Sequence, residues 1–92
     1  MFERKATIAS RVGLHARPAA IFAEAVAEVP LDVTIALDGD PEDDAMDAAS
    51  ILSLMSLGAA NGDVVVLRAE GDGAEGILDA LVKILETDLD AV

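Results

Sequence analysis

The stretch Val64-Val65-Val66-Leu67-Arg68-Ala69 predicts the central strand of a β-sheet. Five of its six residues are apolar, and three of them are β-branched. A strand that is apolar on both faces is typical of a position inside a sheet rather than at its edge. Turn residues flank it, with Asn61-Gly62 before it and Glu70-Gly71-Asp72-Gly73 after it. We therefore expect a neighbouring strand on each side of this segment.

Further strands are predicted on the N-terminal side of this segment. Residues 2–9 alternate between apolar and polar side chains. Residues 32–37 place Val33, Ile35 and Leu37 on one face. A turn at residues 38–41 opens an acidic stretch, and we expect a short, weakly marked strand within residues 41–47.

Three segments have apolar residues at helical spacing. Residues 16–28 and 74–87 each carry one long apolar stripe, and residues 51–57 form a short helix that Asp47 or Ser50 would cap. Gly58 suits the C-terminal end of that short helix. The two long helices would cover one face of the sheet and leave its other face to water.

The predicted fold is therefore α+β, with a single domain over residues 1–92. It is a two-layer open-faced sandwich with the element order β-α-β-β-α-β-α. Its four-stranded sheet is mainly antiparallel, and the helices pack on one face.

Composition excludes several functional classes. The chain has no cysteine, so disulfides, thiolate chemistry and cysteine zinc sites are absent. Its net charge of −12 opposes binding to nucleic acid and to anionic membrane surfaces. No apolar run approaches the ~20 residues of a membrane-spanning helix, and no targeting pattern is visible, so we expect a cytoplasmic location. The acidic residues 38–47 lack the spacing of a calcium loop, and we expect neither a metal ion nor a cofactor.

Functional chemistry is predicted in the segment Gly13-Leu14-His15-Ala16-Arg17-Pro18-Ala19-Ala20, which contains the only histidine. Pro18 suits the first turn of a helix because its missing N–H would be unpaired there. Free N–H groups and the positive dipole end make such a helix start an anion site. Arg17 opposes that dipole, and an anion at His15 would remove the conflict. We therefore predict that His15 accepts and holds a phosphoryl group.

Two motifs resemble those of a known family. Gly13-Leu14-His15-Ala16-Arg17-Pro18-Ala19 is similar to the active-site signature of HPr, the histidine-containing phosphocarrier of the sugar phosphotransferase system. Ser50-Ile51-Leu52-Ser53-Leu54-Met55-Ser56-Leu57-Gly58 resembles the second motif of that family, a serine that opens a short hydrophobic helix. The separation of the motifs and the element order also fit, so the resemblance covers nearly the whole chain.

The resemblance implies a relay of phosphoryl groups. Enzyme I would phosphorylate His15 on its Nδ1 atom, and His15 would pass the group to the A domains of sugar-specific enzyme II. Arg17 and the backbone amides of Ala16 and Arg17 would hold the phosphoryl oxygens. Such a protein is a carrier rather than a stand-alone enzyme, and we expect it to be a monomer.

The short helix suggests a docking surface as well as a core contribution. Its apolar side chains do not all fit into the core, where we expect at least two of Ile51, Leu52, Leu54 and Met55. The functional interpretation is an exposed apolar patch of Ile51, Leu52 and Met55 beside His15, where enzyme I and the A domains dock.

Residues near the expected docking surface bear on its charge and on a regulatory modification. Glu24 and Glu28 occupy the polar side of the first long helix, where family members often carry cations, so docking would depend on the patch and Arg17 or on a partner of altered charge. Ser50 aligns with a serine that a kinase phosphorylates in some relatives, although helix capping also explains it.

Two alternative functions share His15. One is a regulatory module of HPr type that binds transcription factors or enzymes. The other is a phosphocarrier that feeds a dihydroxyacetone kinase or a nitrogen-related relay. These alternatives differ from the sugar relay in their partners rather than in the chemistry at the histidine.

Overall fold

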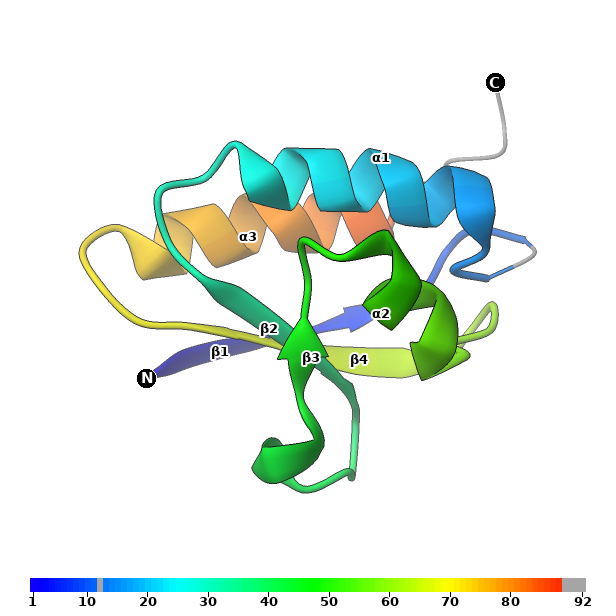
Figure 1. Cartoon of the computed structure of the whole chain (residues 1–92), viewed down its shortest axis with the longest axis horizontal. Coiled ribbons are helices and arrows are strands. Elements are labelled where there is room, and N and C mark those ends of the chain that lie inside the picture. Colours follow the sequence, from blue (N-terminus) through cyan, green and yellow to red (C-terminus); the bar gives the residue numbers. More distant parts are fainter. Residues whose placement is uncertain (12, 89–92) are drawn as a thin grey trace.

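The computed structural model describes residues 1–11 and 13–88. The helices and strands follow one another along the chain in the predicted order, and one short 3-10 helix is added between the second and third strands (Figure 1). The elements are β1 (Phe2–Thr7), α1 (Ala16–Ala27), β2 (Val33–Leu37), η1 (Glu42–Asp44), β3 (Met46–Asp47), α2 (Ile51–Leu57), β4 (Val64–Ala69) and α3 (Ala74–Leu85).

The four strands form one antiparallel sheet in the order β1-β4-β2-β3. Strand β4 is central, as its sequence predicts, and it pairs with β1 on one side and β2 on the other. The register places Ala6 opposite Val65 and Leu37 opposite Val65, so these side chains form one row on the helix side of the sheet. The predicted α+β sandwich is confirmed.

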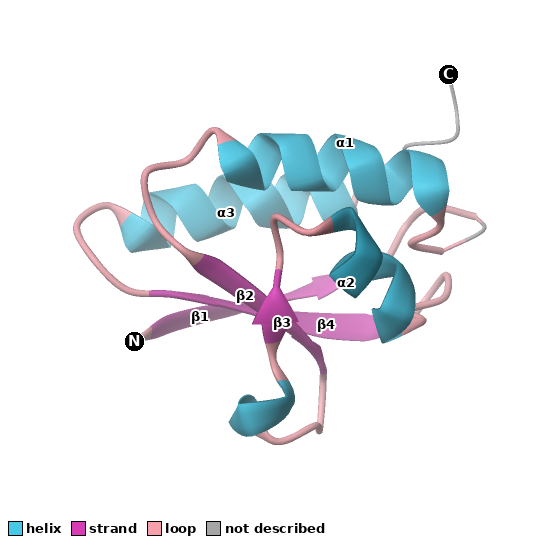
Figure 2. Ribbon diagram, viewed as in Figure 1, coloured by secondary structure: helices cyan, strands magenta, loops and turns pink. Residues whose placement is uncertain are grey.

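The helices lie on one face of the sheet. Helices α1 and α3 run side by side along this face, and α2 lies beside the N-terminal half of α1 (Figure 2). Their apolar stripes and the inner face of the sheet bury one hydrophobic cluster, in which Phe22, Leu54, Leu67 and Leu78 are fully buried. The acidic loop before β3 projects on the side of the sheet away from α1 and α3 (Figure 1).

The structure moves two predicted ends by one residue, because α1 ends at Ala27 instead of residue 28 and β2 begins at Val33 instead of residue 32. Two other ends move by two residues. Strand β1 ends at Thr7 instead of residue 9, because the next two N–H groups turn to other partners: the Ile8 N–H donates to Asp63 and the Ala9 N–H donates to Leu85. Helix α3 ends at Leu85 instead of residue 87. There the Thr87 hydroxyl donates to the Lys83 carbonyl oxygen at 2.7 Å and closes the last turn.

The weakly marked third strand exists, but it has only two residues. Met46 and Asp47 pair with Ile35 and Thr34 of β2. The three acidic residues before them form η1 instead of extending the strand. Short edge strands of this kind limit pairing with other chains.

Candidate functional site

The predicted anion site lies at the start of α1. His15 is the N-cap residue of this helix, with extended backbone angles (φ −96°, ψ −166°), and its side chain does not cap the helix. The Ala19 N–H donates to the His15 carbonyl oxygen at 2.9 Å, which is the first bond of the helix. His15, Ala16 and Arg17 are all exposed, whereas Pro18 is buried against the core. The histidine therefore lies on an open surface that another protein can reach.

Two backbone N–H groups at this helix start are open to an anion. Ala16 and Arg17 are the first two residues of α1, so no carbonyl of the helix can accept from their N–H groups. Within residues 1–11 and 13–88, no other acceptor takes these two N–H groups. Pro18, the third residue, has no N–H to satisfy. The positive end of the helix dipole adds to the attraction for negative charge.

Arg17 differs from the other cationic side chains. Arg4, Lys5, Arg11 and Arg68 each form an ion pair with a carboxylate. In the described part of the chain, neither Arg17 nor Lys83 has such a partner, and Lys83 lies in the last turn of α3, where a cation suits the helix dipole. Arg17 is thus a cation to which no carboxylate of residues 1–11 and 13–88 is paired, at the helix end that disfavours it.

The loop that leads to His15 is closely packed. Gly13 has a φ of +77°, and a Cβ at this position would lie 2.5 Å from the Ala59 carbonyl oxygen. The Leu14 N–H donates to that same oxygen at 2.9 Å, and the Leu14 side chain is buried. Only glycine meets both demands, a left-handed backbone and a close backbone contact. Gly13 therefore fixes the path of the backbone directly before the histidine.

Helix α2 has the cap and the exposed side chains that its sequence predicts. Ser50 is the N-cap residue, and its Oγ accepts from the Ser53 N–H at 3.3 Å, so Ser50 and not Asp47 caps the helix. Gly58 ends the helix with a φ of +70°.

The predicted patch on α2 is exposed. The exposed fractions are 42% for Ile51, 78% for Leu52 and 44% for Met55. The expectation that at least two of the four candidate side chains fill the core is wrong, because of these four only Leu54 is buried. Ile21 on α1 is also exposed, and α1 contacts α2. These four exposed side chains, Ile21, Ile51, Leu52 and Met55, are called the apolar patch below.

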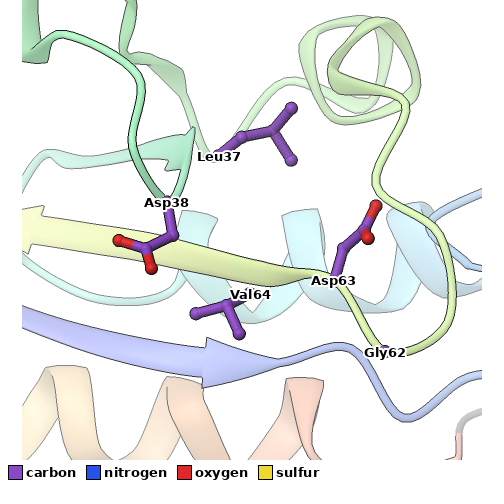
Figure 3. A pocket seen from close by; sticks show the side chains of 5 residues that line it. All are labelled: Leu37, Asp38, Gly62, Asp63 and Val64. Carbon is purple, nitrogen blue, oxygen red and sulfur yellow. The ribbon is translucent and has the colours of Figure 1, made fainter.

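The pocket between β2 and the start of β4 is a weaker candidate for a phosphoryl group than the start of α1. This shallow pocket of about 340 Å³ is lined by Leu37, Asp38, Gly62, Asp63 and Val64. Figure 3 shows how these five residues lie around it. Both of its carboxylates are engaged, because Lys5 pairs with Asp38 at 3.2 Å and the Ala60 N–H donates to Asp63 at 2.9 Å. Their negative charge disfavours a phosphoryl group. Among residues 1–11 and 13–88, no three metal-ligating side chains gather, and no helix is long and apolar enough to cross a bilayer.

One residue near the site was not identified from the sequence. The Asn61 side-chain amide donates to the carbonyl oxygens of Ile8, Ala9 and Ser10 at 3.4, 3.2 and 3.2 Å. The Asn61-Gly62 pair predicts only a turn. Bonds across more than fifty residues leave no local sequence signal that would reveal them.

Comparison with known proteins agrees with the motifs. The family model described as "PTS HPr component phosphorylation site" matches residues 2–87. The phosphocarrier protein HPr of Streptomyces coelicolor is 41% identical over 91 residues, covering 98% of this chain and 94% of the relative. The phosphocarrier protein HPr of Haloferax volcanii is 46% identical over 85 residues, covering 92% and 93%. A crystal structure of HPr from Thermoanaerobacter tengcongensis has a TM-score of 0.82 at 35% identity, covering 100% and 99%.

An open-faced sandwich with these matches defines a class of protein, the phosphocarriers of the phosphotransferase system. Within that class, the chain belongs to the HPr family.

Proposed function

We propose that His15 receives a phosphoryl group from phosphorylated enzyme I and donates it to the A domain of a sugar-specific enzyme II. The N–P bond on the donor histidine breaks as a new N–P bond forms on His15, and the reverse exchange passes the group on. The observation that carries this proposal is an exposed histidine beside two backbone N–H groups and the guanidinium of Arg17. Within the part of the chain that the structure describes, no acceptor takes the two N–H groups and no carboxylate pairs with Arg17. The lack of cysteine supports a cytoplasmic setting for the relay.

The open geometry suits a carrier. A phosphoryl group on His15 would meet the N–H groups of Ala16 and Arg17 and the guanidinium of Arg17, which give charge-assisted hydrogen bonds. Positioning and charge stabilisation are the main needs of phosphoryl transfer. Because the site is exposed, the same group stays within reach of a second protein, whereas a deep pocket would retain it.

The apolar patch is the proposed docking surface for both partners. Its members are exposed side chains of α1, which begins directly after His15, and of α2, which contacts α1, and Leu52 is the most exposed of them. Exposed apolar side chains that gather on one surface are typical of protein interaction sites. Ser50 is placed at the edge of this patch, directly before Ile51, so a phosphate on its Oγ would add about −1.5 to −2 charge there. We propose that such a modification, by a kinase, weakens docking.

Phosphorylation in vitro tests the proposal. The protein is incubated with phosphoenolpyruvate and an enzyme I, and acid-labile phosphate is measured on the wild type and on His15→Ala. We expect one phosphate per chain on the wild type and none on the variant. A wild type that stays unmodified would reject the carrier role and favour the regulatory binding module.

A second experiment, transfer from the phosphorylated protein to different acceptors, distinguishes the sugar relay from the other two. The phosphorylated protein is offered to a sugar-specific A domain and to a dihydroxyacetone kinase subunit or a nitrogen-related acceptor. Transfer to the A domain, faster than to the others, is the result that our proposal predicts.

A further inference from the structure

Residues 59–62 hold the backbone before His15 at both of its ends. At the start, the Asn61 side chain and the Gly62 N–H donate to the carbonyl oxygens of residues 8–10, and the Gly62 bond measures 2.9 Å. At the end, Ala59 accepts from the Leu14 N–H and lies against Gly13. The segment between β1 and the histidine is therefore attached to one short loop at two places.

At the start of this segment, the Asn61 side chain binds the backbone through its NH₂ group, a donor that few side chains carry. Its NH₂ group has two hydrogens, which three consecutive carbonyl oxygens share. Three neighbouring carbonyls that point toward one group repel each other unless a donor lies between them. The amide therefore fixes the direction in which the chain leaves β1.

Packing and backbone geometry do not require asparagine at this position. Asn61 does not have a positive φ, and its side chain is exposed rather than part of the core. What distinguishes it from other small polar residues is the pair of amide hydrogens. Aspartate has the same shape but only accepts, so it would repel the three carbonyl oxygens.

We propose that Asn61 is a positioning residue for phosphoryl exchange at His15. By binding the carbonyl oxygens of residues 8–10, it sets the path of the backbone to His15 and with it the direction of the imidazole at the start of α1. The exchange needs the attacking nitrogen in line with the N–P bond of the partner, and small misplacements slow such reactions strongly. This inference rests on the proposed carrier function.

Rates of phosphorylation by enzyme I test the inference. Asn61→Ala and Asn61→Asp both lose the amide hydrogens, and we expect each to lower the maximal rate on His15 by about tenfold. The concentration at half-saturation stays the same, because the apolar patch is unchanged. Asn61→Gln keeps the donors on a longer stem, and we expect it to recover most of the rate. The loss in the alanine variant, which adds no charge, assigns the effect to the missing donors, and the aspartate variant should lose at least as much because its carboxylate also repels the three carbonyl oxygens.

A second readout needs no phosphoryl transfer. His15 is the only histidine, so the imidazole signals in an NMR spectrum report on it alone. We expect these signals to shift in Asn61→Ala and Asn61→Asp and to return toward the wild type in Asn61→Gln. If the wild type is not phosphorylated, the carrier function fails, while the imidazole signals still test whether Asn61 positions the ring.

A control of lowered stability separates positioning from unfolding. Val29 packs on the core after the C-terminal end of α1, and Val29→Ala lowers the melting temperature without touching the loop. We expect wild-type rates and wild-type imidazole signals in this control. The inference is overturned if Val29→Ala slows transfer as much as Asn61→Ala, or if Asn61→Ala matches the wild type in both readouts.

Discussion

Arg17 illustrates at the scale of one residue how the proposed function would oppose stability. It lies in the first turn of α1, where the helix dipole favours an anion, and no carboxylate in the described chain offsets its charge. A residue chosen for folding alone would carry the opposite charge here. The unfavourable placement makes sense when a phosphoryl group arrives and adds the missing negative charge.

Replacing Arg17 by glutamate separates these two effects. Arg17→Glu favours the helix dipole, so we expect the free energy of unfolding to stay equal or to rise by about 0.3–1 kcal/mol. The rate of phosphoryl transfer falls by about 100-fold, because a charged donor is lost and a carboxylate repels the group. Urea unfolding and phosphorylation by enzyme I measure the two quantities. Wild-type kinetics in this variant would contradict a role of Arg17 in holding the anion.

Residue-scale predictions from sequence succeeded where the signal is local. The helix start at His15 and the Gly58 end were identified, and Ser50 was one of two candidate caps, because each depends on neighbours within a few residues. Two features depend on the α2–β4 loop, far away in sequence. These are the contact of Gly13 with Ala59 and the bonds from Asn61 to residues 8–10, and the sequence alone revealed neither of them.

At the scale of the element, α2 combines two surfaces in seven residues. Leu54 and Leu57 face the core, while Ile51, Leu52 and Met55 face outward. A helix of two turns has little intrinsic stability, so packing on the inner face must hold it in place. The side chains of the outer face can then bind a partner without lowering the stability of the fold.

Matched leucine variants on the two faces test this division. Leu54 is fully buried, so Leu54→Ala should lower the free energy of unfolding by about 2–5 kcal/mol. Leu52 is 78% exposed, so Leu52→Ala should change it by about 0.5 kcal/mol at most. We expect Leu52→Ala to weaken binding to enzyme I in a calorimetric titration. Unchanged affinity in Leu52→Ala would remove Leu52 from the proposed docking surface.

Substitutions at the cap of α2 separate an effect on stability from an effect on docking. Ser50→Ala loses the bond to the Ser53 N–H and should cost about 1 kcal/mol, with docking preserved. Ser50→Asp keeps a capping oxygen, so its stability stays near the wild type, while the added charge beside Ile51 weakens docking. Ser50→Asn is the control, since it caps without charge and should match the wild type in both. Equal docking by Ser50→Asp and Ser50→Asn would argue against regulation through charge.

Elements with strong patterns were predicted closely, and the exceptions have physical causes. The alternation in β2, the apolar run of β4 and the stripes of α1 and α3 predicted their places to within about two residues. The acidic segment before β3 has neither the alternation of a strand nor the apolar stripe of a helix. Its structure follows from the pairing of Met46 and Asp47 with β2, which is a tertiary contact.

At the scale of the whole molecule, negative charge dominates. Eighteen acidic side chains face six Lys and Arg, so most carboxylates have no cation of their own. The Cα radius of gyration is 11.7 Å, and the Debye length is about 8–10 Å at 0.1–0.15 M salt, so carboxylates repel each other across much of the surface. The exposed ion pairs of Arg4, Lys5 and Arg11 add about 0–1 kcal/mol each and do not balance this repulsion.

Salt should therefore stabilise the protein. We expect the melting temperature to rise by several degrees between 0.02 and 0.5 M KCl, because about 1 kcal/mol corresponds to about 4–8 °C for a chain of this size. The rise should level off near 1 M, where the Debye length is about 3 Å and screening is nearly complete. Stabilisation by excluded solutes would instead continue to increase with concentration.

The acidic residues of η1 provide the matched variant for this prediction. Glu42, Asp43 and Asp44 are exposed, and within the described chain none of them forms an ion pair. Replacing all three by Gln, Asn and Asn removes three negative charges without removing a contact. The variant should melt at a higher temperature than the wild type in 0.02 M KCl, and the difference should shrink in 1 M KCl. A difference that stays constant across this range would mean that local structure, and not charge repulsion, sets the stability of the acidic loop.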